Sequence, residues 1–98
     1  MYFLVTGHDY KDEDSLNRRM KARGEHMAGI EAMLKDKTLL MACAMVNEDD
    51  QMCGSTMILD MENREAVDRY LDQEAYILQK VWERVEVTPC KVPPLFLK

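Results

Sequence analysis

The chain has 98 residues and a mass of 11.4 kDa, which is the size of one domain and leaves no room for a second, regulatory one. Hydrophobic residues make up 47% of the chain and charged residues 32%, which is the composition of a globular protein rather than of a disordered tail. Thirteen Lys and Arg residues against eighteen Asp and Glu residues give a formal net charge of −5. This balance argues against nucleic acid or an anionic membrane as a partner, because both need clustered cationic charge.

Membrane insertion and secretion are also disfavoured. The longest unbroken apolar run covers only residues 39–46, whereas a membrane span needs about 20 residues. Residues 1–5 are apolar but lack the basic flank and the cleavage site of a secretory signal. The three cysteines form no C-x-x-C pair, which disfavours a disulfide framework or a structural zinc site. They are Cys43, Cys53 and Cys90. We therefore expect free thiols and a cytoplasmic protein.

The first third of the chain predicts a strand and then a helix. Residues 1–7 are short, apolar and rich in β-forming side chains. A polar loop over 8–14 follows, and Asp14 or Ser15 can cap the helix that begins there and ends over 35–38. At 100° per residue this helix carries an apolar stripe, which predicts its buried face. The stripe consists of Leu16, Met20, Met27, Ile30 and Leu34.

The rest of the chain predicts a hairpin, helical segments and a last strand. In chain order these are a strand over 38–46, a turn over 47–50, a strand over 52–61, a helix over 63–71, a helix or irregular turn over 73–81 and a half-buried strand around 84–87. We expect the last strand to stop before Pro89, because proline cannot donate to a sheet ladder.

The resulting order, β-α-β-β-α-β, predicts an α+β domain with a ferredoxin-like fold. Its four-stranded antiparallel sheet carries both helices on one face and leaves the other face bare. Apolar residues at consecutive positions over 39–46 need a cover on that face. A second copy of the sheet is the expected cover, so we predict a homodimer.

Three polar residues on the first helix indicate a candidate site. Arg19, Arg23 and His26 lie inside or beside the apolar stripe. One interpretation is two snorkelling arginines and a hydrogen-bonded structural histidine. The other is a pocket under the helix, in which Arg23 attracts an anionic oxygen and His26 transfers a proton. The spacing alone does not decide between them.

Several segments, in order along nearly the whole chain, resemble the YciI-like (YCII-related) family. Arg23-Gly24-Glu25-His26 resembles the family's R-P-x-H segment, and residues 82–89 are similar to its Y-E-x-V-x-V-x-P ending. Between them lie matches at Leu39-Leu40-x-Ala42, Gly54-Ser55-Thr56 and residues 65–76. The resemblance implies a single domain over 1–98 with a ferredoxin-like fold that assembles as a dimeric α+β barrel. This agrees with the order of elements read above.

The resemblance also implies an enzyme with a His–Asp pair in a pocket between helix and sheet, in a family most of whose members lack a known substrate. His26, Arg23 and Ser55 match family positions. Glu74 falls on the aspartate position and Asp72 lies two residues earlier, so either carboxylate is a candidate partner of the imidazole.

The chain departs from the family pattern at three places. Gly24 and Ala75 stand where the family has proline, and Cys43-Ala44 stands for its Gly-Pro. These departures favour an alternative function, a non-catalytic ligand-binding or assembly module that keeps the dimeric barrel.

Sulfur side chains alternate along one predicted strand. Met41, Cys43 and Met45 face one side of it, which is compatible with a soft Cu(I) site but is better explained by an adaptable core. Cys43 is also a candidate nucleophile if it lies opposite His26. Asp9, at the end of the first strand, is a candidate for the pocket mouth.

The sequence thus predicts a small cytoplasmic enzyme that transfers protons, of the lyase or isomerase type, on a small anionic or aromatic-derived metabolite. His26 is the expected acid or base, with Asp72 or Glu74 orienting it. The candidate substrate-binding residues are Arg23, Ser55, Asp9 and Cys43. No Gly-rich phosphate loop or metal-ligand cluster is present, so no cofactor or metal is expected.

The C-terminal tail carries a prediction of its own. Pro93 and Pro94 end any sheet pairing, and Leu95, Phe96 and Leu97 after them would be exposed apolar residues. We expect this tail to pack across the partner subunit.

Overall fold

The computed structural model describes residues 1–97. Its elements are β1 (Tyr2–Asp9), α1 (Ser15–Lys35), β2 (Leu39–Val46), β3 (Met52–Asp60), α2 (Arg64–Leu71), α3 (Ala75–Leu78) and β4 (Trp82–Cys90), followed by a short 3₁₀ helix (Pro94–Phe96). The predicted β-α-β-β-α-β order is confirmed. The stretch left open as helix or irregular turn contains the four-residue α3.

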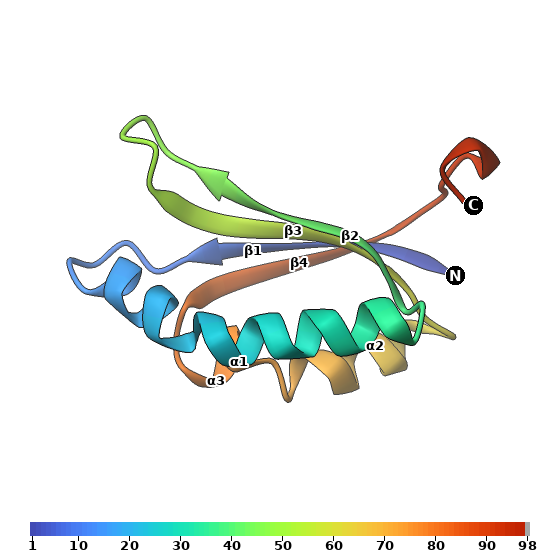
Figure 1. The fold of residues 1–98 in the computed structure, drawn as a ribbon, viewed down its shortest axis with the longest axis horizontal. Coiled ribbons are helices and arrows are strands. Elements are labelled where there is room, and N and C mark those ends of the chain that lie inside the picture. The colour runs from blue at the N-terminus through green and yellow to red at the C-terminus, as the bar shows by residue number, and fades with distance from the viewer. Residues whose placement is uncertain (98) are drawn as a thin grey trace.

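One antiparallel sheet orders the strands β2-β3-β1-β4, so β1 and β3 are central and β2 and β4 are edges. All three α-helices lie on one face of this sheet, and the other face carries none (Figure 1). The 3₁₀ helix at the end of the chain stands beyond the sheet, away from the α-helices (Figure 1). The predicted two-layer α+β architecture is therefore correct.

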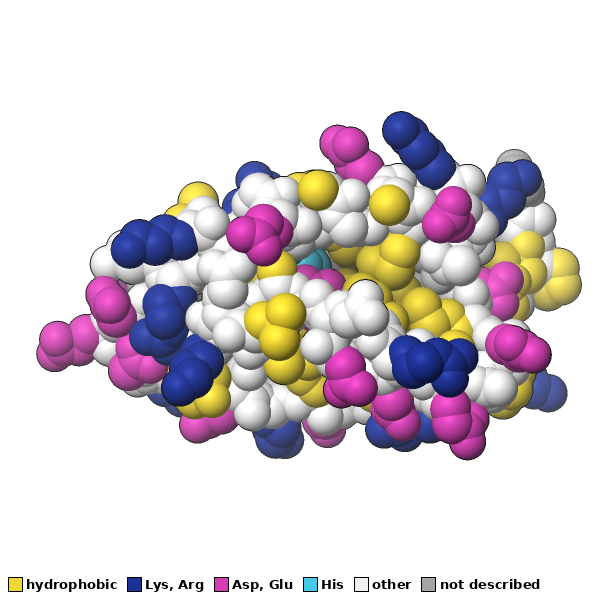
Figure 2. All heavy atoms as spheres, turned by 90° about the horizontal axis from the view of Figure 1, so that it is seen from below, with side chains coloured by type: hydrophobic (Ala, Val, Ile, Leu, Met, Phe, Trp, Pro, Cys, Tyr) yellow, Lys and Arg dark blue, Asp and Glu magenta, His cyan; other side chains and the backbone are white. Residues whose placement is uncertain are grey.

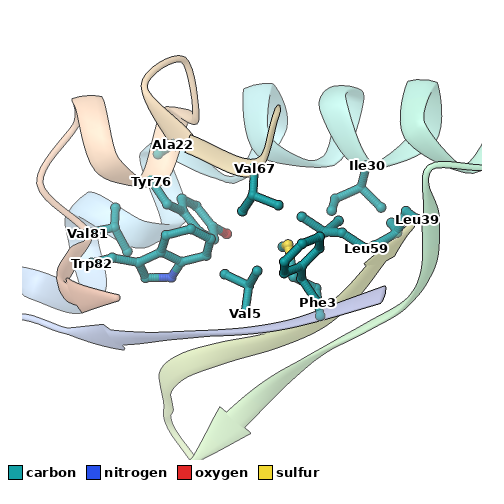
Figure 3. Close-up of a cluster of buried hydrophobic side chains, with 11 residues drawn as sticks. Phe3, Val5, Ala22, Ile30, Leu39, Leu59, Val67, Tyr76, Val81 and Trp82 are labelled. Atoms are coloured by element: carbon teal, nitrogen blue, oxygen red, sulfur yellow. The ribbon is translucent and has the colours of Figure 1, made fainter. Parts of the chain in front are cut away.

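The hydrophobic core lies between the sheet and the helices (Figure 3). Side chains alternate along a strand, and on β1 every second residue, from Phe3 to Asp9, is buried against the helices. The buried cluster consists of Phe3, Val5, Ala22, Ile30, Leu39, Met57, Leu59, Val67, Tyr76, Val81 and Trp82. Its polar end, around Tyr76 and Trp82, adjoins the site described below.

The buried face of α1 differs from the predicted apolar stripe. The residues that α1 buries are Arg19, Ala22, His26 and Ile30. Met20 and Leu34, both in the predicted stripe, are each 51% exposed. The prediction is correct for Ile30 and wrong for Met20, Met27 and Leu34, because the buried face is shifted toward the polar Arg19 and His26, which lie inside or beside the stripe. The helix runs through Gly24 without a break.

The last strand is longer than predicted. β4 extends through Pro89, which pairs in register with Phe3 of β1. β4 is an edge strand with β1 as its one neighbour, and an edge strand tolerates a proline whose nitrogen points to the open side. At the start of α1, Asp14 occupies the N-cap position, but its side chain makes no capping hydrogen bond.

Strand β2 leaves apolar side chains uncovered in the single chain. Met41 is 48% exposed and Val46 is exposed as well. Beside it, a groove of about 470 Å³ on the bare face is lined mostly by apolar side chains, including Leu4, Ile58 and Phe96. Among residues 1–97, no helix is both long and apolar enough to cross a membrane.

Candidate functional site

A cavity of about 200 Å³ lies between α1 and the strands β2 and β3. Its polar lining residues are Arg19, Arg23, His26, Ser55 and Tyr76, and its other walls are formed by Met27, Ile30, Ala42, Cys43, Ala44, Met52 and Met57. Such a mixture of apolar walls and a few convergent polar groups is typical of a small-molecule site. The surface is also hollowed between the helices, where a histidine and an acidic side chain are visible among hydrophobic side chains (Figure 2).

A histidine that lines the cavity is paired with a buried carboxylate. Nδ1 of His26, on α1, lies 2.5 Å from Oε1 of Glu74, and both side chains are buried. Glu74 is the N-cap residue of α3, and its Oε1 also accepts a hydrogen bond from the backbone N–H of Tyr76 at 3.3 Å. The turn before α3 therefore places the carboxylate against the helix that carries the imidazole.

Asp72 does not take part in this pair. It is the C-cap residue of α2, its side chain is exposed, and it forms no hydrogen bond with His26. Asp72 belongs to the end of α2, where its side chain points to solvent, whereas Glu74 begins α3 and its side chain is buried. Of the two candidate carboxylates, only Glu74 meets the imidazole.

Hydrogen bonds keep Glu74 ionised. Burial opposes its ionisation, but the bonds from His26 and from the Tyr70 hydroxyl, which donates to Oε2, outweigh burial and lower the pKa of Glu74. Burial and the Glu74 charge raise the pKa of Tyr70, so its hydroxyl stays protonated. An ionised carboxylate at Nδ1 holds the proton of a neutral imidazole on that nitrogen. The other nitrogen, Nε2, is then the acceptor.

Two aromatic rings fix the plane of the imidazole. Tyr76 stacks on His26 with ring centroids 3.9 Å apart and an interplanar angle of 10°. Trp82 meets His26 edge to face at 5.9 Å, and it also meets Tyr76 at 5.5 Å. Figure 3 shows Tyr76 and Trp82 side by side above β1. Because three rings constrain one another, the imidazole has little freedom to turn away from Glu74.

Arg19 anchors a buried polar network beneath the cavity. Its guanidinium is 2% exposed, and its NH1 group donates to both carboxylate oxygens of Asp9 at 2.8 and 3.0 Å. Its NH2 group donates to the Gly54 carbonyl at 3.0 Å and to the Ser55 hydroxyl at 2.7 Å. The guanidinium also lies over the Tyr76 ring, 4.8 Å from its centroid. The network ties α1 to β1 and β3.

Asp9 is therefore not at the cavity mouth as predicted. It is buried, it is paired with Arg19, and it does not line the cavity. Burial raises the pKa of Asp9, and the charge of Arg19 offsets this only in part. The alternation of β1 turns Asp9 to the helix side, where a carboxylate needs a cationic partner, and Arg19 supplies it.

Ser55 does line the cavity. Its hydroxyl oxygen accepts hydrogen bonds from Arg19 and, at 3.2 Å, from Nε1 of Trp82. Since the oxygen accepts twice, its own proton is free to donate. Gly7 makes this arrangement possible, because a Cβ at that position would lie 2.5 Å from the Trp82 ring.

Cys43 does not face His26. It borders the cavity, but its register partner is Thr56, whereas its neighbour Ala44 pairs with the buried Ser55. Side chains alternate along a strand, so the thiol lies on the bare face of the sheet. Met41 and Met45 share that face, so in the single chain these sulfur side chains lie outside the core between sheet and helices.

Arg23 lies at the cavity as an unpaired cation. It is exposed, and no carboxylate of residues 1–97 is within ion-pair distance of it. Within the same residues, no group of three or more His, Cys, Asp or Glu side chains is arranged to hold a metal ion. Arg23, Nε2 of His26 and the Ser55 hydroxyl are thus polar groups that the cavity offers to a ligand.

Comparison with known proteins places the chain in a family. Residues 1–91 match the YCII-related domain. The chain belongs to this family. It is 33% identical to the protein YciI of Escherichia coli O6:H1 over 97 residues, which covers 93% of this chain and 97% of that protein. It is 28% identical to an uncharacterized protein of Haemophilus influenzae, again covering 93% of this chain and 97% of that protein.

Two solved structures resemble this YCII-related domain in fold. One is the 5-chloro-2-hydroxyhydroquinone dehydrochlorinase TftG from Burkholderia phenoliruptrix, in complex with 2,5-dihydroxybenzoquinone. It aligns with a TM-score of 0.81 at 19% identity and covers 97% of this chain and 98% of that chain. The other is a dimeric ferredoxin-like protein of unknown function from Jannaschia, with a TM-score of 0.51 at 14% identity, covering 93% and 98%. The ferredoxin-like fold is confirmed.

Proposed function

We propose that this YCII-related domain is a small enzyme that transfers a proton on a small ring-shaped anion, in a lyase or isomerase reaction. The observation that carries the proposal is that His26, which lines the cavity, is paired with the buried Glu74. Structural histidines are also hydrogen-bonded. A structural role, however, does not call for an ionised buried partner, a ring held by two aromatic neighbours and a face on a cavity.

The geometry gives each group a role. His26 accepts a proton from substrate carbon or oxygen at Nε2, and the imidazolium that forms is stabilised by the ionised Glu74. The same Nε2 proton is then returned to another substrate atom or to a leaving group, so the enzyme ends unchanged. Arg23 and the Ser55 hydroxyl bind substrate oxygens and stabilise the negative charge that develops on them.

Cavity size and charge support the substrate class. A volume of about 200 Å³ is close to the roughly 150 Å³ of an apolar cavity known to hold benzene, so one six-membered ring fits. Arg19 is neutralised by Asp9, whereas Arg23 lines the cavity without an ion-pair partner among residues 1–97. One ring with one negative charge would pair with this cation. TftG, of similar fold, is a dehydrochlorinase whose structure holds a dihydroxybenzoquinone.

The proposed enzyme works as a cytoplasmic homodimer. Free cysteines at all three positions favour a reducing compartment. The bare sheet face with its apolar β2 and groove favours a second copy as its cover, and one of the similar structures is described as dimeric.

Turnover and binding together test this proposal. The probe for turnover is 5-chloro-2-hydroxyhydroquinone, followed by its absorbance, and binding of 2,5-dihydroxybenzoquinone is followed through Trp82, the only tryptophan. We expect His26→Gln to reduce turnover about 10²–10⁴-fold, because a positioned acid–base group contributes that much. His8→Gln, a matched change on the bare face, should retain activity.

Three results would count against the proposal in different ways. Full activity of His26→Gln would remove the histidine from the chemistry. Tight binding without turnover would favour the non-catalytic binding module. The absence of both binding and turnover would exclude this substrate class.

A further inference from the structure

The second oxygen of Glu74 has a partner that the sequence did not single out. Oε1 faces His26, and Oε2 accepts a hydrogen bond from the hydroxyl of Tyr70 on α2, four residues earlier. The same hydroxyl lies 3.6 Å from Sδ of Met57, a much weaker acceptor, so its single proton goes to the carboxylate. Both oxygens of the buried carboxylate are thus occupied, one by the imidazole and one by a phenol.

The two side-chain donors on this carboxylate compete for its charge. While His26 is neutral, Glu74 carries its full negative charge and the Tyr70 hydrogen bond is at its strongest. When His26 becomes an imidazolium, it draws on the same charge, and the Tyr70 bond weakens. The phenol therefore stabilises the neutral state of His26 more than the charged state. By linkage, it lowers the tendency of the imidazole to take up a proton.

We propose that Tyr70 is a positioning residue that tunes the proton affinity of His26 through Glu74. Its catalytic meaning rests on the proposed function of the His26–Glu74 pair. Tyr70 does not line the cavity, so it does not touch substrate and acts only through the carboxylate.

The setting of Tyr70 supports this role. Glu74 is buried and Tyr70 is half-buried, and low polarity strengthens hydrogen bonds to a charge. The pKa of Tyr70 is raised by burial and by the Glu74 charge, so the phenol remains a donor wherever His26 titrates. The ring of Tyr70 packs beside the core, and a phenylalanine would keep that packing.

The experiment is an NMR titration of the two imidazoles in the full chain. His26 and His8 are its only histidines, so His8 serves as an internal reference. In Tyr70→Phe we expect the midpoint of the His26 titration to rise by about half a pH unit, with His8 unmoved. The control is Tyr76→Phe, which also removes a phenol hydroxyl beside His26 but not one that bonds Glu74.

A second variant keeps the test decisive if Tyr70→Phe unfolds. Tyr70→3-fluorotyrosine keeps the ring and makes the hydroxyl a stronger donor, so the His26 midpoint should fall instead of rise. A His26 midpoint unchanged in both variants, or moved equally by Tyr76→Phe, would overturn the proposal. The titration needs no substrate, so its failure is distinguishable from the loss of the proposed enzymatic function, which His26→Gln tests by turnover.

Discussion

At the scale of single residues, the site combines a buried ion pair and a buried histidine–carboxylate hydrogen bond. Arg19 and Asp9 neutralise each other inside the core, and neither oxygen of Asp9 is free for a ligand. His26 and Glu74 also pair, but the imidazole keeps one nitrogen free at the cavity. We therefore infer that the first pair serves the fold and the second the proposed chemistry. The difference comes from where each pair lies relative to the cavity.

The first pair predicts a stability effect. Asp9→Asn leaves Arg19 charged and buried without its counter-ion, which should lower the free energy of unfolding by about 3–5 kcal/mol in urea titrations. Asp12→Asn is the matched control, since Asp12 forms a similar fork with Arg18 at the surface, where such pairs contribute little. Equal stability of the two variants would show that the buried pair is not needed for folding.

At the scale of elements, the site depends on how closely β1 approaches the start of β4. Trp82 lies directly over Gly7, and from there it contacts Ser55, Tyr76 and His26. A side chain at position 7 would push the indole away from all three. A glycine in the middle of a strand thus links the sheet to the imidazole.

Gly7→Ala should destabilise the protein by about 1–3 kcal/mol, the usual cost of overpacking a core. It should also shift the emission of Trp82. Gly29→Ala is the control, because nothing lies within 4 Å of the added Cβ and alanine favours the helix by about 0.5–1 kcal/mol. Gly7→Ala with wild-type stability and emission would contradict the close approach of Trp82 as the reason for the glycine.

The sequence predicted the order of elements well but not which side of α1 is buried. Along strands such as β1, buried and half-buried residues alternate, and this two-residue period remains recognisable even where a few residues are polar. On α1, Arg19 and His26 sit at the centre of the buried face, and a search for apolar residues misplaces that face. Glu74 was found through a family resemblance, because a turn and not a periodicity turns it inward. Tyr70 and Trp82 act through contacts between distant elements, which no local pattern shows.

At the scale of the whole molecule, the single chain leaves one face of the sheet uncovered. The bare face carries the apolar side chains of β2 and a groove bordered by the C-terminal tail. Phe96 in this tail is 64% exposed, and Lys98 lies outside the described residues. A second copy on this face would cover the apolar side chains of β2 and the groove. A stable interface of this kind buries more than about 1,000 Å².

Light scattering should therefore give the mass of two chains at low micromolar concentration. Deleting residues 93–98 should raise the dimer dissociation constant without unfolding the sheet, because the tail follows the end of β4 and its apolar side chains are largely exposed in the single chain. A single-chain mass for the intact protein would refute the dimer. An unchanged dissociation constant after the deletion would show that the tail lies outside the interface.

The most direct test of the account is the rate of substrate turnover by His26→Gln beside the wild type, with both proteins folded by circular dichroism. The account predicts turnover of the chlorinated hydroxyhydroquinone by the wild type and a loss of about 10²–10⁴-fold in the variant. Equal rates in the two proteins would contradict the central claim that His26, held by Glu74, transfers the proton.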